Sequence, residues 1–163
     1  PMKTRLFLLT LLVLFLVFVP AVSVSSQSDA AQAAAARLDE VMGRASGVIS
    51  YLTGEGFIVE HIELDILMKG FSYGIDYPLY AGYYYQIVGI GGPVIGDLDG
   101  YLFNSLGELV DFDQELDDVP VLQIAPTENG LYRLEFHFAS LAPGFPEDSV
   151  GYIVFIVAAA RVD

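Results

Sequence analysis

The stretch DLDGYLFNSLGELVDFDQELDDVPVLQIAPTENGLY, residues 97–132, indicates the fold more clearly than any other part of the chain. Short apolar runs alternate with polar residues and are separated by turn residues, which is typical of antiparallel strands joined by tight connections. Asn104-Ser105-Leu106-Gly107 has the size of a hairpin turn, and Asn129-Gly130 is the strongest short hairpin signal in a sequence. The stretch therefore predicts an all-β domain.

Similar patterns lie on both sides of this stretch. In residues 57–68, Ile62, Leu64, Ile66 and Met68 alternate with His61, Glu63 and Asp65, which is typical of a half-buried strand. Val150–Ala160 is almost wholly apolar, as a central strand covered on both faces would be. Further strands are predicted at 83–89, 98–103, 109–113, 121–125 and 131–139, with the glycine-rich residues 89–96 as a loop. Seven or so short strands of this kind predict an antiparallel β-sandwich.

Residues 24–54 form an Ala-rich segment that predicts one amphipathic helix ahead of the sandwich. Its apolar residues recur at three- and four-residue spacing, namely Leu38, Val41, Ala45, Val48, Ile49 and Leu52. Gly43 and Gly47 also give it a pair of small residues four positions apart. Two interpretations are open: the helix packs on the domain or acts as a spacer, or the segment Ala31–Leu52 makes the chain oligomeric.

The first 23 residues have the pattern of an export signal. Lys3 and Arg5 precede an apolar run of 14 residues, Leu6–Val19, and small residues follow Pro20. A membrane-spanning helix needs about 20 apolar residues, so this run is short for an anchor. We therefore expect a signal peptide at 1–23, the helix at 24–54 and the sandwich domain at 55–163, in an extracytoplasmic (periplasmic or secreted) protein with no membrane span after cleavage.

Composition narrows the classes of partner. After residue 23, five basic residues face 21 acidic ones, and such a surface repels phosphate backbones and anionic lipid. Nucleic acid is therefore excluded as a partner, whereas metal cations and basic protein surfaces fit. The chain has no Cys, which excludes disulfides, zinc–thiolate sites and a thiol nucleophile.

Eight carboxylates and no Lys or Arg lie between residues 97 and 118. Asp97 and Asp99 belong to one predicted strand, and Asp111 and Asp113 belong to the next. If the two strands pair, the four side chains converge, and calcium prefers such a set of oxygen ligands. The alternatives are a solvated acidic face or Asp side chains that cap turns. Calcium bound by these four residues is the metal site that the sequence predicts.

Other groups give weaker signals. His61, Glu63 and Asp65 share one side of a predicted strand, either as a metal site or as exposed polar residues, and His137 lies beside Glu135 on the polar side of another. The tyrosines between residues 73 and 85 belong either to the core or to a face that contacts sugars or proteins. No Ser lies in a nucleophile motif, so a hydrolase would have to use paired carboxylates.

The order of several short motifs resembles the bacterial pre-peptidase C-terminal domain over roughly half of the chain. The matching segments are LYAGYYYQI at 79–87, DLDGYL at 97–102, GELV at 107–110 with Asp113, DVPVL at 118–122, Pro126-Thr127 with Gly130-Leu131-Tyr132, and Gly151-Tyr152. The resemblance implies a jelly-roll-like sandwich that serves as a non-catalytic accessory module, usually of a secreted peptidase. Some related sandwiches bind calcium or fibrous polymers. The Ala-rich helix is not part of the family pattern.

Together these observations predict a secreted, non-catalytic accessory or binding module, stabilised by calcium if the four Asp residues converge, with a protein or polysaccharide partner. Two alternatives are open. One is a hydrolase of envelope polymers that uses paired carboxylates, and the other is a structural envelope protein that self-associates through its helix.

Overall fold

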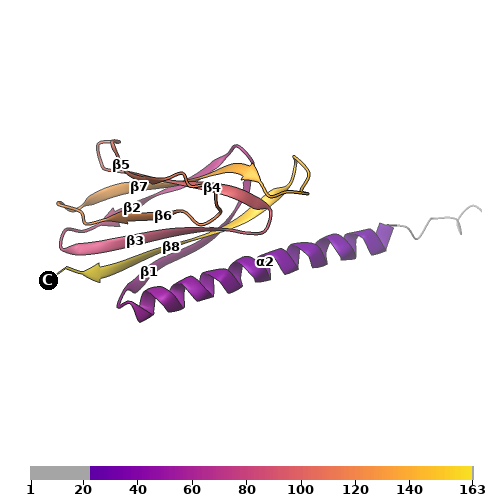
Figure 1. Cartoon of the computed structure of the whole chain (residues 1–163), viewed down its shortest axis with the longest axis horizontal. Helices are drawn as coiled ribbons and strands as arrows, with labels where there is room; N and C mark the ends of the chain where they lie inside the picture. Colours follow the sequence, from indigo (N-terminus) through magenta and orange to yellow (C-terminus); the bar gives the residue numbers. More distant parts are fainter. Residues whose placement is uncertain (1–22, 163) are drawn as a thin grey trace, which may run out of the picture. The chain divides into compact units, whose positions relative to one another are not determined.

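The computed structural model describes residues 23–162, so the predicted signal peptide lies outside the described residues except for Ser23. Within residues 23–162, the elements follow one another as one helix and eight strands (Figure 1). They are α2 (Ser23–Gly54), β1 (Ile58–Met68), β2 (Ser72–Leu79), β3 (Tyr83–Gly91), β4 (Ile95–Phe103), β5 (Leu109–Asp113), β6 (Val121–Ile124), β7 (Gly130–Leu141) and β8 (Val150–Arg161). No helix within residues 23–162 combines the length and the apolar character that a membrane crossing requires.

The strands form two four-stranded sheets in which every pairing is antiparallel. Sheet A has the order β1-β8-β3-β6, and sheet B has the order β2-β7-β4-β5. Eight antiparallel strands divided between two sheets in this order make a jelly roll. The predicted class, an antiparallel jelly-roll-like sandwich preceded by a helix, is therefore confirmed.

The main core lies between the inner faces of the two sheets. Phe136 of β7 stacks on Phe155 of β8 with ring centroids 5.5 Å apart, and both rings are fully buried. A side chain at Gly89 of β3 would meet the Phe136 ring at 2.6 Å, so the ring packs directly on the backbone. Gly89, predicted as the last residue of one strand and the first of a loop, lies inside strand β3, which continues to Gly91.

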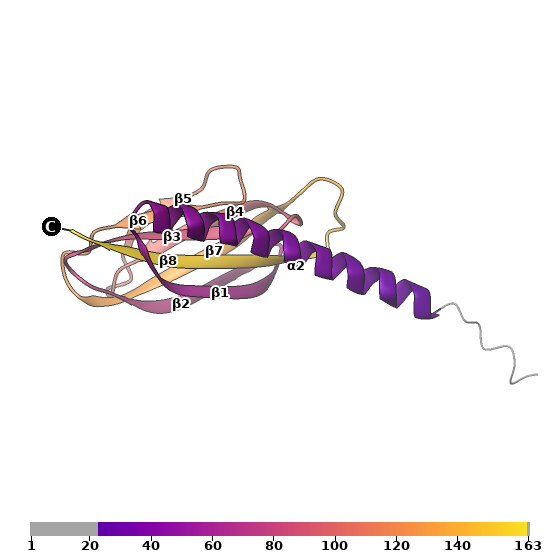
Figure 2. The same ribbon diagram turned by 90° about the horizontal axis from the view of Figure 1, so that it is seen from below.

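The chain divides into two compact units, residues 1–35 and 36–163. In the second unit, the part of α2 from Ala36 onward packs on the outer face of sheet A, over β8 and β3 (Figure 2). Its buried residues Val41, Ala45 and Leu52 belong to the predicted apolar stripe. Strand β8 is therefore buried on both faces, as its apolar sequence predicted.

An ion pair fixes the helix on sheet A. The two terminal nitrogens of Arg44 donate to the two carboxylate oxygens of Asp118 at 2.5 and 2.8 Å, and one of them also donates to the carbonyl of Gly91 at 2.6 Å. The hydrogen bonds to Asp118 raise the pKa of Arg44. Gly43 and Gly47 lie on the exposed side of α2, so self-association through them stays a prediction.

Strand β1 has the predicted alternation, but its two faces are reversed. The aliphatic side chains of Ile62, Leu64, Ile66 and Met68 point outward and are about half exposed. His61, Glu63, Asp65 and Leu67 point toward the other sheet. The prediction that His61 lies on an exposed strand face is therefore wrong. The alternation of apolar and polar residues in a strand does not reveal which of its two faces points toward the core.

The inward polar residues of β1 are satisfied at the open side between β1 and β2. Glu63 accepts hydrogen bonds from the Tyr73 hydroxyl and from His61 Nε2, the latter at 3.0 Å. The His61 ring also lies 5.4 Å from Tyr77 and 5.6 Å from Phe155 between centroids. The bond to Glu63 raises the pKa of Tyr73 to about 12, while the same contact lowers the pKa of Glu63.

Strand β2 was not among the predicted strands. Gly74 and Pro78 lie inside it, and both residues are depleted in strands. Pro is tolerated at the edge of a sheet, where its missing N–H is not needed for pairing, and β2 is an edge strand of sheet B.

The reversed face of β1 gives a direct test with neighbouring residues. Leu67 is 6% exposed and Ile66 is 53% exposed. We expect Leu67→Ala to lower the free energy of unfolding by about 2–5 kcal/mol, as for other buried Leu residues, and Ile66→Ala by less than about 1 kcal/mol. Urea denaturation measures both values, and a larger loss for Ile66→Ala would show that the faces are assigned wrongly.

Candidate ligand-binding face

The outer face of sheet B is free of any other described helix or strand. The strand register arranges its side chains in three rows that cross the sheet. The rows are Asp76, Arg133 and Phe103; Gly74, Glu135, Tyr101 and Phe112; and Ser72, His137 and Asp99. We call these residues the sheet B face. Charged, aromatic and hydroxyl groups thus lie side by side on the outer face of sheet B, on the side away from the core of the sandwich.

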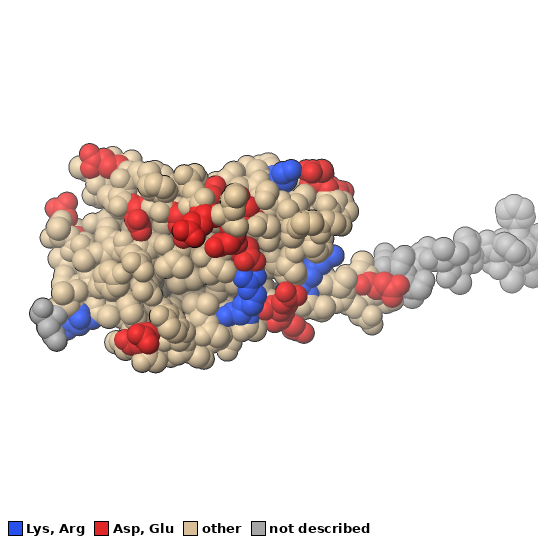
Figure 3. All heavy atoms as spheres, in the orientation of Figure 1, with Lys and Arg blue, Asp and Glu red and all other residues tan. Residues whose placement is uncertain are grey.

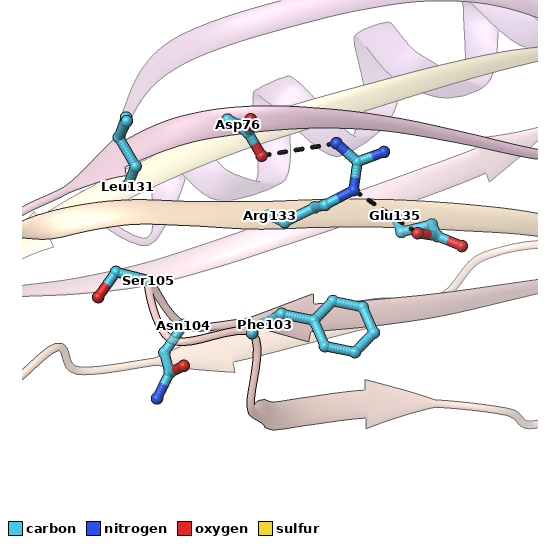
Figure 4. Close-up of a pocket in the computed structure, with 8 residues that line it drawn as sticks. Asp76, Phe103, Asn104, Ser105, Leu131, Arg133 and Glu135 are labelled. Carbon is cyan, nitrogen blue, oxygen red and sulfur yellow. Dashed lines mark ion pairs between the residues drawn. The ribbon is translucent and has the colours of Figure 1, made fainter.

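Arg133 occupies the centre of the first row. Its guanidinium group lies 3.5 Å from Asp76 on β2 and 3.8 Å from Glu135 on its own strand (Figure 4). A side chain at Gly74 would meet Arg133 Nη2 and the carbonyl of Leu134, each at 2.9 Å. The missing side chain at Gly74 therefore leaves room for Arg133 to extend over β2 toward Asp76.

An open pocket of about 690 Å³ surrounds Arg133. Its lining combines apolar, amide, hydroxyl and charged groups from β2, β4, β7 and the β4–β5 turn, namely Asp76, Phe103, Asn104, Ser105, Gly107, Leu131, Arg133 and Glu135. Its size falls within the range of small-ligand sites, about 300–1,000 Å³.

The β4–β5 turn that forms one wall of this pocket is held by Asn104. The side-chain oxygen of Asn104 accepts the backbone N–H groups of Leu106 and Glu108 at 3.0 and 2.9 Å. Gly107 has a φ of 78°, a conformation that favours glycine. The hairpin turn predicted from this segment is therefore present.

Three aromatic side chains continue the face beside the pocket. Tyr101 lies directly across from Phe112 on β5, and Phe103 is the next outward residue on β4. The Tyr101 hydroxyl donates to Asp99 at 3.2 Å and accepts from Gln114 Nε2 at 2.7 Å. Burial, and then the charge of Asp99, raise the pKa of Tyr101, so its hydroxyl stays a neutral donor.

The four predicted calcium ligands are not brought together. Strands β4 and β5 pair as expected, but Asp111 and Asp113 lie across from Leu102 and Gly100, whose side is the inner one. There Asp111 accepts the backbone N–H of Gln123 at 2.6 Å, and Asp113 accepts that of Val121 at 2.9 Å. Both carboxylates thus bond the free edge of β6.

Asp97 and Asp99 lie on β4 just before the residues that pair with β5, and Asp99 lies on the outer side of the sheet, opposite to the side of Asp111 and Asp113. Asp99 is 9% exposed and lies beside His137 across the strand pair. Asp97 has one buried carboxylate oxygen without a hydrogen-bond partner. Within residues 23–162 no three His, Asp or Glu side chains are grouped as a metal site would require. Calcium binding by the four Asp residues stays a prediction.

The tyrosines between residues 73 and 85 are divided between core and surface. Tyr85 is fully buried, and Tyr73 and Tyr77 pack against the core. Tyr80 and Tyr83 are exposed, but neither belongs to the sheet B face. Arg133, Asp76 and Phe103 were not predicted as site residues. One available signal was that Arg133 is the only Lys or Arg between Lys69 and Arg161.

The buried carboxylate of Asp97 gives a pH-dependent prediction. Burial, and then the charges of Asp99 and Asp117, raise the pKa of Asp97 above its usual 3.8. The folded chain then binds this proton more readily than the unfolded chain, so stability falls as the pH rises through the raised pKa. We expect Asp97→Asn to raise the Tm at pH 7, and the gain to disappear near pH 3, where the carboxyl of the unaltered chain is protonated.

Thermal melts at the two pH values in the presence of a chelator measure this effect. The exposed Asp148→Asn is the control, for which we expect the same Tm as the unaltered chain at pH 7. A lower Tm for Asp97→Asn at pH 7 would contradict a destabilising charge at this position.

Calcium is tested by the same melts with the ion in place of the chelator. If Asp97, Asp99, Asp111 and Asp113 bind calcium in the folded chain, the Tm rises with calcium concentration because the ion binds the folded chain preferentially. Equal Tm values in calcium and in chelator would show that the folded chain does not bind calcium.

Comparisons with known proteins add little to this geometry. No protein-family model matches the sequence, and no curated protein matches it. Among solved structures, the chain is similar to one described as a structural and functional characterisation of Pseudomonas aeruginosa AlgX, with 16% identity and a TM-score of 0.35. The match covers 66% of this chain and 27% of that one, so the chain spans well under two thirds of its length. What the structure shows is the β-sandwich, and the resemblance to the pre-peptidase C-terminal domain stays a prediction.

Proposed function

We propose that this chain is an extracytoplasmic, non-catalytic binding module that holds its ligand on the sheet B face. The observation that carries the proposal is the open pocket around Arg133 on a sheet face that no described element covers. The opposite face of the sandwich is occupied by α2. One face therefore serves folding, and the other is free for a ligand.

The composition of the pocket supports binding. Aromatic and aliphatic surface from Phe103 and Leu131 adjoins the donors of Arg133 and the amide and hydroxyl groups of Asn104 and Ser105. A site of this kind, with apolar surface and a few placed polar groups, is typical of ligand recognition. The export-signal pattern at residues 1–23 supports an extracytoplasmic location, and the motif order that resembles the pre-peptidase C-terminal domain supports an accessory role.

Retention on insoluble polymers tests this function. The panel contains cellulose, chitin, and polygalacturonate and gelatin cross-linked to insoluble beads, and we expect at least one of them to retain the chain. Arg133→Ala should weaken that retention about tenfold or more, because it removes the charged donor at the centre of the pocket. Leu116→Ala, at a loop residue that is 91% exposed and outside the pocket, should leave retention unchanged.

Three results would count against the proposal. Retention by none of the polymers, or equal retention of Arg133→Ala and the unaltered chain, would remove the sheet B face as a binding site. Release of soluble sugar from a polymer that is abolished by one Asp or Glu substitution would show that the chain is a hydrolase that uses carboxylates, and not a non-catalytic module. Melting curves of each variant confirm that it is folded.

A further inference from the structure

We infer that the ligand of the sheet B face is an uncharged glycan, one of whose sugar rings lies against Phe103 while its hydroxyl groups bond the Arg133 cluster. The Arg133 cluster consists of Asp76, Arg133 and Glu135. This inference rests on the proposed function and narrows it to one chemical class. Four features of the face lead to it.

The first feature is aromatic surface beside the cluster. Phe103 lies next to Arg133 across the β4–β7 pair and lines the pocket (Figure 4). Tyr101 and Phe112 form the adjacent cross-strand pair, and Phe112 is 55% exposed. The C–H groups on one side of a sugar ring form a flat apolar surface that packs on such rings, while its hydroxyl groups stay at the edge.

The second feature is the mixture of donors and acceptors around Phe103. Arg133 only donates hydrogen bonds, and Asp76 and Glu135 in their ionised form only accept them. Ser105 does both, whereas the side-chain oxygen of Asn104 already accepts two backbone N–H groups of the turn, so that Asn104 offers only its amide N–H groups. A hydroxyl group also does both, so neighbouring hydroxyls of a sugar can accept from the guanidinium group and donate to a carboxylate at once.

The third feature is charge. Three carboxylates on the face, Asp76, Asp99 and Glu135, outnumber its one permanently basic residue, Arg133. The chain as a whole carries a formal charge of −14, and on the visible surface in Figure 3 Asp and Glu exceed Lys and Arg. An anionic polymer would approach against this field, whereas an uncharged one pays no such cost.

The fourth feature disfavours an extended peptide as the ligand. Strand addition requires free backbone groups at a sheet edge. The edge strands of sheet B are β2 and β5, whereas its central strands, β7 and β4, are paired on both sides. Arg133 and Phe103 belong to these two central strands. At Arg133 and Phe103 the face therefore offers side chains and no unpaired strand edge, which suits a glycan better than a polypeptide backbone.

Native affinity electrophoresis with matched soluble polymers tests the inference. Hydroxyethylcellulose and carboxymethylcellulose share a backbone and differ in charge, and methyl-esterified and free polygalacturonate form a second such comparison. Galactomannan and xyloglucan widen the neutral set, and gelatin represents polypeptide. We expect one or more neutral polymers to retard the chain, and each charged counterpart to retard it less.

Variants of Phe103 test whether a sugar ring of the ligand contacts this residue. Phe103→Ala should weaken the binding of the neutral polymer about tenfold, whereas Phe103→Tyr, which keeps the ring, should retain it. Phe71→Ala is the matched control, because Phe71 is 61% exposed and lies in the β1–β2 connection outside the face. Measuring the melting curve of Phe103→Ala separates loss of binding from loss of folding. If Phe103→Ala unfolds, Phe103→Leu carries the test, because it removes the aromatic ring but keeps an apolar side chain, and it should also weaken the binding.

The possible results separate the two proposals. Retardation only by the charged polymers or by gelatin would overturn the uncharged glycan and leave a binding module. Retardation by a neutral polymer that is the same for Phe103→Ala, Phe103→Tyr and Phe71→Ala would overturn the contact with Phe103. Retardation by none of the polymers, together with no retention in the insoluble panel, would overturn both the glycan and the proposed function.

Discussion

The contact between α2 and sheet A determines which face of the sandwich is available to a ligand. Apolar residues of α2 from Ala36 onward bury the outer face of β8 and β3, and Arg44 joins the helix to Asp118 and to the carbonyl of Gly91. Without this cover, the outer residues of β8, such as Val154 and Ile156, would be exposed. Sheet B has no comparable apolar outer surface, so its outward side chains are free to be polar and aromatic.

Several carboxylates of this acidic chain act on the edges of the sheets. Asp111 and Asp113 reach from β5 to the backbone of β6, and Asp65 accepts the N–H of Ile66 at 2.7 Å on the edge strand β1. Glu63 joins β1 to the Tyr73 hydroxyl of β2. Unpaired edge groups invite pairing with other chains, and these side chains occupy them. Much of the acidity that indicated a cation site in the sequence therefore has a structural use.

The features of the fold that depend on the local sequence pattern could be predicted. The features that depend on the register between strands could not. Alternation identified β7, whose Phe136 and Phe138 point inward and whose Arg133 and Glu135 point outward, as expected. The same alternation in β1 did not reveal which side faces the core. For the four Asp residues, the pairing of β4 with β5 was right, and the register, which the pattern does not give, sets Asp111 across from Leu102. Calcium binding itself stays a prediction. The pair of Arg133 with Asp76 depends on β2, which the pattern did not reveal.

The ion pairs around Arg133 also bear on how the face would bind. The guanidinium group lies 3.5 Å from Asp76 and 3.8 Å from Glu135, with room left by Gly74, and because these side chains are partly exposed the ion pairs restrain it only weakly. Its charge is already partly balanced by the two carboxylates, and a ligand anion would have to compete with them. A hydroxyl group does not need to displace either partner, because it can bond the outer edges of the same groups. The balance of charges around Arg133 therefore supports the proposed preference of the site for uncharged ligands.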